Sequence, residues 1–334
     1  MKVTLLAAWI AFSFSFTSMA DEPVTLLGGR PAPLLPLDFG LNDHVEVDDY
    51  RIGDEFGKHP AVLGESDEVA LLDRTLKATA KVGGGTGFYL GKFGGEHVMA
   101  TNYHVCQAAW SCSFRPVRFT AMNDRASFGR WIGSWTDIDL ALFTIRPDAE
   151  LAQKLEGLGM NFDYNNDLYP GQPLYTAGYG IAGNTARSLM VNYDLDCSVF
   201  SDSAEFRFMA DPDELNTGSY MAWSFANGCD VSHGDSGSAM VDRETGAVVG
   251  IIWTGKIPKS SIVKDSTFLT DVLESRNNDV IWTELSYSVP SKKIGEHLAH
   301  LISTGELSGW KSTVVGEMLS TELEPHCPPC RTVH

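Results

Sequence analysis

The stretch Asn227–Val241, NGCDVSHGDSGSAMV, decides the fold and poses the first question of chemistry. It places Ser236 in a run of small residues, Gly234-Asp235-Ser236-Gly237-Ser238, directly before an apolar segment. A serine embedded in glycines leaves the backbone unobstructed, so that two N–H groups can point at one oxygen atom, as acyl transfer requires. Ser236 is therefore the candidate nucleophile, and the amides of Gly234 and Ser236 are the candidate oxyanion donors. The Gly-x-Ser-x-Gly turn of α/β-hydrolases is excluded because position 238 is serine.

Serine chemistry also needs an imidazole to accept the hydroxyl proton and a carboxylate to orient that imidazole. Among nine histidines, His104 stands in MATNYHVC, directly after the predicted strand 97–101. In TDIDLALFTI, Asp139 opens an apolar strand, and Asp137 is the competing carboxylate two residues earlier. Strand position favours Asp139, because the edge of a core desolvates a carboxylate and strengthens its hydrogen bond to an imidazole.

Short apolar runs separated by Gly and Asn continue from Thr75 to about residue 290, which predicts an all-β domain. Residues 21–74, Pro-rich and then acidic, are interpreted as an N-terminal extension or propeptide without regular structure. Near the end, SKKIGEHLAHLIS predicts a helix capped by Ser291, with an apolar stripe of Ile294, Leu298, Leu301 and Ile302. On this helix, His297 and His300 are expected to face solvent. Residues 306–334 are expected to form a C-terminal tail.

The N-terminus predicts export. Lys2 precedes the apolar run Val3–Phe16, and Ser18-Met19-Ala20 fits a signal-peptidase site, so residues 1–20 are interpreted as a cleaved signal peptide. A secreted or periplasmic protein can form disulfides, and the neighbouring cysteines suggest the pairs 106–112, 197–229 and 327–330. Cys327-Pro-Pro-Cys330 lacks a thioredoxin-like context, so a structural clip is preferred to a redox site.

The formal net charge of −18 makes nucleic acid and anionic membranes poor partners, and no later segment is apolar enough for stable membrane insertion. The sequence does not determine the oligomeric state.

The blocks GTGFYL, HVMATNYHVC, DIDLALF, CDVSHGDSGSAMV and VVGIIWTG, in that order, resemble the trypsin/chymotrypsin-like serine endopeptidases, and more closely their secreted bacterial branch. The matching span is about residues 75–300. The order His, Asp, Ser is that of this family and differs from the order in subtilisins and α/β-hydrolases. Cys106 stands one residue later than the cysteine that usually follows the family's histidine.

The resemblance implies two six-stranded antiparallel β-barrels, about 75–160 and 161–290, with a C-terminal helix. The protease domain would then span residues 75–305. The family's triad falls on His104, Asp139 and Ser236, and the strand that holds the substrate backbone falls on Ile252, Trp253, Thr254 and Gly255. The expected substrate is a peptide or protein, and no metal or organic cofactor is needed.

Two further aspartates leave alternatives open. Asp230, six residues before Ser236, matches the carboxylate that selects Arg or Lys in trypsin. Bacterial relatives often carry such a Cys-Asp pair without basic specificity, position 232 lacks the bracing cysteine, and Val231 and His233 could shape a different pocket. Asp235 needs a cationic or hydrogen-bonding partner, because an unpaired buried carboxylate is costly. The sequence does not identify that partner.

Overall fold

The computed structural model describes residues 24–25, 58–60, 67–165, 167–180, 188–192, 197–200, 206–211, 221–255, 280–281 and 286–321. The predicted signal peptide and the Cys327–Cys330 pair lie outside these residues. In the part of the chain that is described, no helix is long and apolar enough to cross a membrane.

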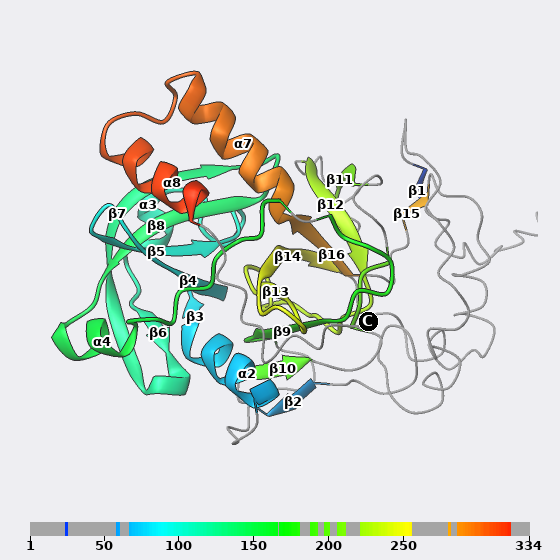
Figure 1. Ribbon diagram of the computed structural model, residues 1–334, viewed down its shortest axis with the longest axis horizontal. Coiled ribbons are helices and arrows are strands. Elements are labelled where there is room, and N and C mark those ends of the chain that lie inside the picture. The colour runs from blue at the N-terminus through cyan, green and yellow to red at the C-terminus, as the bar shows by residue number, and fades with distance from the viewer. Residues whose placement is uncertain are drawn as a thin grey trace, which may run out of the picture.

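The first half of the domain is a closed six-stranded antiparallel barrel with the strand order β3-β4-β5-β8-β7-β6 (Figure 1). Its strands are β3 (Thr79–Val82), β4 (Gly85–Phe93), β5 (Glu96–Thr101), β6 (Val117–Phe119), β7 (Asp124–Trp135) and β8 (Leu140–Arg146). The β8 segment LALFTI is buried at every position, because one face fills the barrel and the other lies under neighbouring elements. The predicted first barrel is confirmed.

The second half is an eight-stranded sheet with the order β11-β12-β16-β14-β13-β9-β10-β2. Its strands are β2 (Lys58–Pro60), β9 (Leu174–Gly178), β10 (Met190–Asn192), β11 (Arg207–Ala210), β12 (Met221–Asn227), β13 (Ala239–Asp242), β14 (Val248–Gly255) and β16 (Ser286–Pro290). The second half therefore differs from the expected six-stranded barrel: it is a sheet of eight described strands, to which β2 adds an edge strand from the N-terminal segment. The all-β architecture of two β units followed by a helix is confirmed.

Smaller elements complete the described chain. A two-stranded sheet pairs β1 (Val24–Thr25) with β15 (Val280–Ile281). Two short helical segments connect barrel strands, namely α3 (Ala109–Cys112) and η1 (Thr120–Met122), and α4 (Ala149–Lys154) follows the last barrel strand, β8.

The segment before the barrel contains a helix that the sequence analysis missed. The strand expected from Thr75 begins only at Thr79, because α2 (Asp67–Ala78) occupies the preceding residues. Leu76 of α2 is fully buried in a cluster with Tyr179 and Val191 of the second half. The alternation of TLKATAKV concealed this helix, which ties the N-terminal segment to the sheet.

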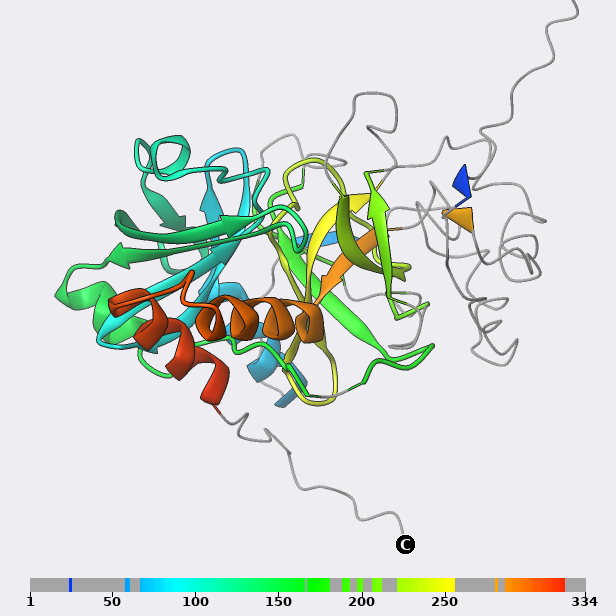
Figure 2. The ribbon, with the colours of Figure 1, turned by 90° about the horizontal axis from the view of Figure 1, so that it is seen from above.

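The C-terminal helices join the two halves of the domain. The predicted helix is α7 (Ser291–Ser303), which follows β16 directly and contacts β14. The second helix, α8 (Trp310–Ser320), contacts both α7 and β4 of the barrel (Figures 1 and 2). The predicted tail therefore includes a packed helix, whose central glycine and β-branched residues weaken its periodic pattern.

The N-cap prediction for α7 is wrong, because Pro290 occupies that position and Ser291 is the first helical residue. The Ser291 hydroxyl instead donates to the Val248 carbonyl at 2.7 Å, which holds the start of the helix against β14. Three residues of the predicted stripe, Ile294, Leu298 and Leu301, are buried, and Ile302 packs against the same core.

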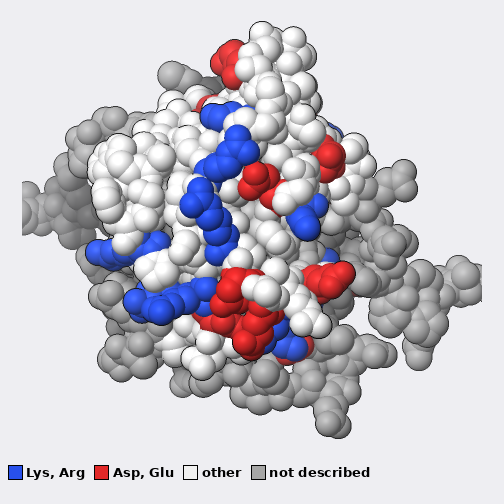
Figure 3. All heavy atoms as spheres, turned by 90° about the vertical axis from the view of Figure 1, so that its left-hand side faces the viewer, with Lys and Arg blue, Asp and Glu red and all other residues white. Residues whose placement is uncertain are grey.

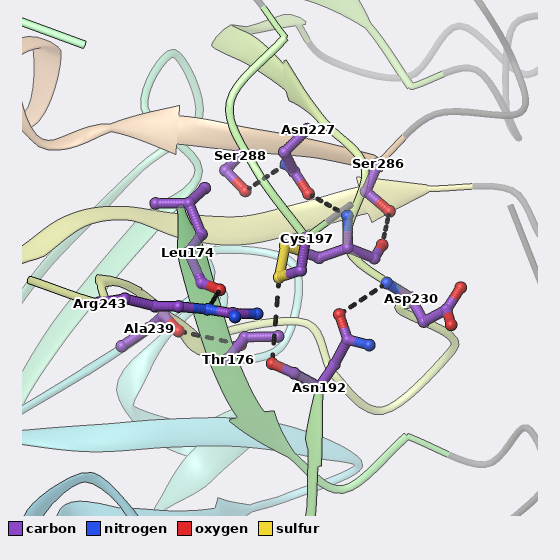
Figure 4. The surroundings of a disulfide bond; sticks show 11 residues. Leu174, Thr176, Asn192, Cys197, Asn227, Asp230, Ala239, Arg243, Ser286 and Ser288 are labelled. Atoms are coloured by element: carbon purple, nitrogen blue, oxygen red, sulfur yellow. Dashed lines mark hydrogen bonds between the residues drawn. A yellow bond between two sulfur atoms is a disulfide. The ribbon is translucent and has the colours of Figure 1, made fainter. Parts of the chain in front are cut away.

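The structure contains disulfides Cys106–Cys112 and Cys197–Cys229, with Cα separations of 5.6 and 4.0 Å. Both were predicted. The second joins the segment after β10 to the end of β12, at the base of the loop that leads to Ser236 (Figure 4). There the Ser286 hydroxyl donates to the Cys229 carbonyl at 2.6 Å, which adds a contact to β16.

Leu298→Ala is expected to lower the free energy of unfolding by about 2–5 kcal/mol, because a fully buried leucine leaves a cavity when it is truncated. Chemical denaturation checks this value. The control is His300→Ala on the exposed face of α7, for which a change of about 0.5 kcal/mol or less is expected. Equal effects of the two substitutions would contradict the packing described for α7.

Candidate active site

His104 and Asp139 form the closest contact between the candidate catalytic residues. His104 lies in the turn after β5, and its Nδ1 is 2.8 Å from Asp139 Oδ2. Its backbone N–H donates to the other oxygen, Oδ1, at 3.1 Å. A carboxylate only accepts hydrogen bonds, so Nδ1 carries the proton and Nε2 remains an acceptor. The Asp139 side chain is 0% exposed and that of His104 is 32% exposed, so the carboxylate is desolvated while the imidazole reaches solvent.

The backbone around Asp139 is fixed from both sides. Asp139 ends a turn in which its N–H donates to the Thr136 carbonyl at 3.1 Å, and β8 begins at the next residue. Its φ of 34° is left-handed, a region that non-glycine residues rarely occupy. The Asp139 carbonyl accepts from Asn102 Nδ2 at 2.9 Å and from the Tyr103 N–H at 3.1 Å. Contacts with the His104 loop therefore hold this strained residue in place.

The competing carboxylate, Asp137, has a different partner. Its Oδ2 lies 2.7 Å from Nδ1 of His297 on α7, and its carbonyl accepts from the Trp223 N–H at 2.9 Å. The expectation that His297 faces solvent is wrong, because its side chain is only 19% exposed and packs edge-on against Trp135. His300 is exposed, as expected. The two neighbouring aspartates are thus divided between His104 and His297.

Ser236 lies where the barrel and the sheet meet. The Ser236 carbonyl accepts from the Thr86 N–H of β4 at 2.9 Å. A Cβ on Gly85 would lie 2.8 Å from that carbonyl oxygen and 2.7 Å from Cγ2 of Val105, the residue after His104. Only glycine allows this approach, which brings the Ser236 loop beside the His104 loop.

The loop around Ser236 leaves selected amides unused. The N–H groups of Asp235, Gly237 and Ser238 donate to carbonyls of Ser232, Ile252 and Asp235, respectively. Within the described residues, the N–H groups of Gly234 and Ser236 have no acceptor. Gly234 has a φ of 104°, and its carbonyl is held by the Thr86 hydroxyl at 2.7 Å. Two fixed N–H donors thus remain available at the position predicted for the oxyanion donors.

Asp235 anchors this loop from behind. Its side chain is almost fully buried and accepts from the Gly180 N–H at 2.9 Å, the Ser232 N–H at 2.9 Å and the Ser232 hydroxyl at 3.3 Å. These neutral donors provide the hydrogen-bonding partners that the sequence analysis could not identify. A Cβ on Gly178 or Gly180 would collide with the carboxylate, so the Thr-Ala-Gly-Tyr-Gly sequence at the end of β9 makes room for Asp235.

Asp230 is buried next to the Cys197–Cys229 disulfide. Its N–H donates to Asn192 Oδ1 at 3.0 Å, and its carboxylate is turned away from the disulfide (Figure 4). Val231 is buried and His233 is exposed. The segment that leads from Cys229 to Ser236 thus begins in the protein interior, where the disulfide holds it.

The strand predicted to hold the substrate backbone is the last part of β14. Two hydrogen bonds of 2.9 Å join Ile252 to the Ser236 loop. The Ile252 carbonyl accepts from the Gly237 N–H, and the Ile252 N–H donates to the Ser238 carbonyl. The β13–β14 pairing ends at Ala239↔Ile251, whereas pairing with β16 continues to Gly255. In the described chain, Thr254 and Gly255 therefore have a strand neighbour on the β16 side only. The buried Trp253 indole donates to Ser224 Oγ at 2.8 Å and fixes this segment.

Several residues that organise the site carry no chemical motif. The Thr86 hydroxyl and the Asn102 amide donate to backbone carbonyls, and Gly180 donates through its own N–H. His297 acts from a helix far along the chain. The sequence signals the role of Thr86 only through the glycine-rich stretch Gly83–Gly87, which permits close approach of the backbone.

The barrel, the second sheet and the Ser236 loop define the class of serine peptidases with a chymotrypsin-like fold. A family model described as the trypsin-like peptidase domain matches residues 85–251, half of the chain. The chain therefore belongs to the trypsin-like peptidase family and is a serine-type peptidase.

Solved structures similar to the chain include an inactive form of Rv3671c from M. tuberculosis. It is 16% identical, with a TM-score of 0.46 over 74% of this chain and 97% of that one. The serine endoprotease from Yersinia pestis is 13% identical, with a TM-score of 0.42 over 72% and 69% of the two chains. No curated protein matches the chain.

Asp235→Ala is expected to lower the free energy of unfolding by about 3 kcal/mol, because the buried amides of Gly180 and Ser232 lose their acceptor. Chemical denaturation measures the loss. Ser232→Ala is the matched control. It removes the 3.3 Å hydroxyl contact and keeps the backbone N–H bond to Asp235, so a change of about 1 kcal/mol or less is expected. A tolerated Asp235→Ala would show that this carboxylate does not anchor the loop.

Proposed function

We propose that the protein is a secreted serine endopeptidase that hydrolyses peptide bonds through an acyl-enzyme intermediate. The observation that carries the proposal is the 2.8 Å contact between His104 Nδ1 and the fully buried Asp139 carboxylate, next to the loop that bears Ser236. This contact leaves Nε2 of an oriented imidazole available as a base.

In the proposed reaction, Ser236 Oγ attacks the scissile carbonyl carbon while His104 Nε2 accepts the hydroxyl proton. The carbonyl oxygen becomes an oxyanion and is stabilised by the N–H groups of Gly234 and Ser236. Collapse breaks the C–N bond, and His104 returns its proton to the leaving amine. Water then attacks the ester with His104 again as base, which releases the acid and restores Ser236. Asp139 stabilises the charged imidazolium at both stages.

The substrate backbone is proposed to lie along the end of β14. The proposed strand begins at Ile252, whose N–H and carbonyl are bonded to the Ser236 loop. Trp253, Thr254 and Gly255 extend past the last pair with β13, so an extended peptide can approach them on that side. Asp230 is proposed to contribute to the pocket for the residue before the scissile bond. A preference for Arg or Lys and a pocket shaped instead by Val231 and His233 remain the two alternatives, which cleavage-site mapping with wild type and Asp230→Ser separates.

Export is proposed on two grounds. Residues 1–20 have the pattern of a signal peptide, and the two disulfides of the structure are typical of oxidising compartments. Residues 21–74 are proposed as an N-terminal extension, of which α2 packs on the domain. Sequencing the N-terminus of the exported protein tests the cleavage site.

A fluorophosphonate probe tests the nucleophile. Stoichiometric labelling is expected on Ser236, located by mass spectrometry of the labelled peptide, and His104→Ala should abolish it because the hydroxyl loses its base. A folded protein that takes no label, even after limited proteolysis of residues 21–66, would support the alternative that the chain is a catalytically silent binding module.

Asp139→Asn and Asp137→Asn form a matched pair. Asp139→Asn is expected to reduce kcat by about 10⁴-fold, because an amide favours the wrong imidazole tautomer. Asp137→Asn changes the contact with His297, and a loss of about tenfold or less is expected, since that residue touches no reacting group. The measurement is kcat on a peptide cleaved by the wild type. The reverse ranking would assign the orienting role to Asp137.

A further inference from the structure

Three basic residues lie directly opposite one another on neighbouring strands of the barrel. Lys81 of β3 is the partner of Arg118 of β6, and Arg118 is the partner of Arg125 of β7. Paired residues point to the same face of a sheet, and Arg118 and Arg125 are both exposed. We call Lys81, Arg118, Arg125 and the nearby Arg115 the basic row.

The basic row is not explained by the stability of the fold. Like charges directly opposite each other on paired strands repel and destabilise the sheet. Arg115, Arg118 and Arg125 have no acidic partner within the part of the chain that the structure describes. The nearest acid in sequence, Asp124, is bound to Lys154 at 2.7 Å. A protein with a net charge of −18 thus keeps several cations together on one surface.

A pocket of about 270 Å³ lies within this row. Its lining consists of Lys81, Gly83, Arg115, Pro116 and Arg118. Three of its five lining residues are cationic, and a Cβ on Gly83 would meet no atom within 4 Å, so the glycine side is open. Figure 3 shows the side of the molecule on which the barrel lies, where several Lys and Arg side chains follow one another across the surface with Asp and Glu side chains beside them.

The pocket is adjacent to the candidate active site through two connections. Lys81 of β3 pairs with Thr86 of β4, whose N–H donates to the Ser236 carbonyl at 2.9 Å. The Lys81 ammonium also lies 5.5 Å from the centre of the Tyr179 ring, and the Tyr179 backbone packs against Gly234. The second connection runs through Arg115. This residue follows Cys112, whose disulfide with Cys106 links it to the His104 loop.

We propose that the basic row binds a carboxylate-rich segment of the polypeptide substrate, a few residues from the scissile bond. The row belongs to the barrel, whereas β14 belongs to the second sheet, so the acidic segment lies on the side of the scissile bond opposite to the part held by β14. The inference rests on the proposed peptidase function. Nucleic acid and anionic membranes fit poorly, because they extend beyond the basic row and the rest of this acidic protein would repel them, whereas a short acidic segment meets the row alone.

The test uses two pairs of synthetic peptides that share one cleavage sequence, which is first mapped by mass spectrometry on denatured casein. In each pair, one peptide carries three Glu residues and the other carries three Gln residues. The first pair carries them beyond the scissile bond, and the second pair carries them before it. On one side only, Glu is expected to lower KM by about tenfold at unchanged kcat, since each exposed charge pair contributes modestly. The preference should vanish at about 1 M salt, which screens exposed charges.

The double variant Arg118→Gln/Arg125→Gln is expected to lose this preference while it cleaves the Gln peptide as the wild type does. Its melting temperature should be equal or higher, because the repulsion is removed. The matched control is Lys92→Gln near the end of β4, which removes an exposed cation that pairs with His97 rather than with the row and should keep the preference. Equal KM values for the Glu and Gln peptides, or an unchanged Glu preference in the double variant, would overturn the proposal.

Binding to the Ser236→Ala protein separates this proposal from the proposed function. Fluorescence anisotropy of labelled Glu and Gln peptides reports the basic row without any cleavage. Tighter binding of the Glu peptide that depends on Arg118 and Arg125 supports the row even if the wild type cleaves neither peptide. Faster cleavage of the Gln peptide by the double variant would instead show that acidic residues of the chain itself occupy the row, which contradicts the proposal.

Discussion

The arrangement of the site depends on Thr86, a buried residue of the barrel that holds the loop of the second sheet. Its N–H donates to the Ser236 carbonyl, and its hydroxyl donates to the Gly234 carbonyl. The same hydroxyl accepts from the Tyr179 N–H, while its carbonyl accepts from the Thr101 hydroxyl. The N–H and the hydroxyl of Thr86 thus connect the two halves, and its carbonyl is held within the barrel. Because each buried group would be costly to leave unpaired, the relative position of the halves is tightly defined.

The buried aspartates show how one residue type serves different purposes through its surroundings. Asp235 accepts from backbone amides and a hydroxyl, so it organises a loop and has no described contact with an imidazole. Asp139 accepts from His104 through both oxygens and is completely buried. Asp137, which is partly exposed, binds His297. The local chain conformation, set by the turn at residues 136–139, sends the two neighbouring carboxylates to different histidines.

The parts that the sequence predicted are those set by local pattern. The antiparallel strands, the helix of residues 291–303, the two described disulfides and the order of His104, Asp139 and Ser236 follow from periodicity and motif spacing. The structure brings His104 and Asp139 into contact. Its backbone places the Ser236 loop beside the His104 loop.

The parts that the sequence did not predict depend on contacts between distant segments. Helix α2 is stabilised by burying Leu76 against the second half of the domain, and its own pattern resembles a strand. Helix α8 has a weak pattern and is held by β4 and α7. The partners of Asp235 are mostly backbone amides, which any sequence possesses. The pairing of His297 with Asp137 required knowledge of where α7 lies.

The contact between His297 and Asp137 has a consequence for the order in which the domain assembles. His104 and Asp139 are both supplied by the barrel, whose strands are neighbours in sequence, so their contact closes only a short loop of chain. The support from α7 closes a far longer loop and must wait for the last part of the chain to emerge during synthesis. A nascent chain that ends before α7 can therefore form the contact between His104 and Asp139 but lacks the contact between His297 and Asp137.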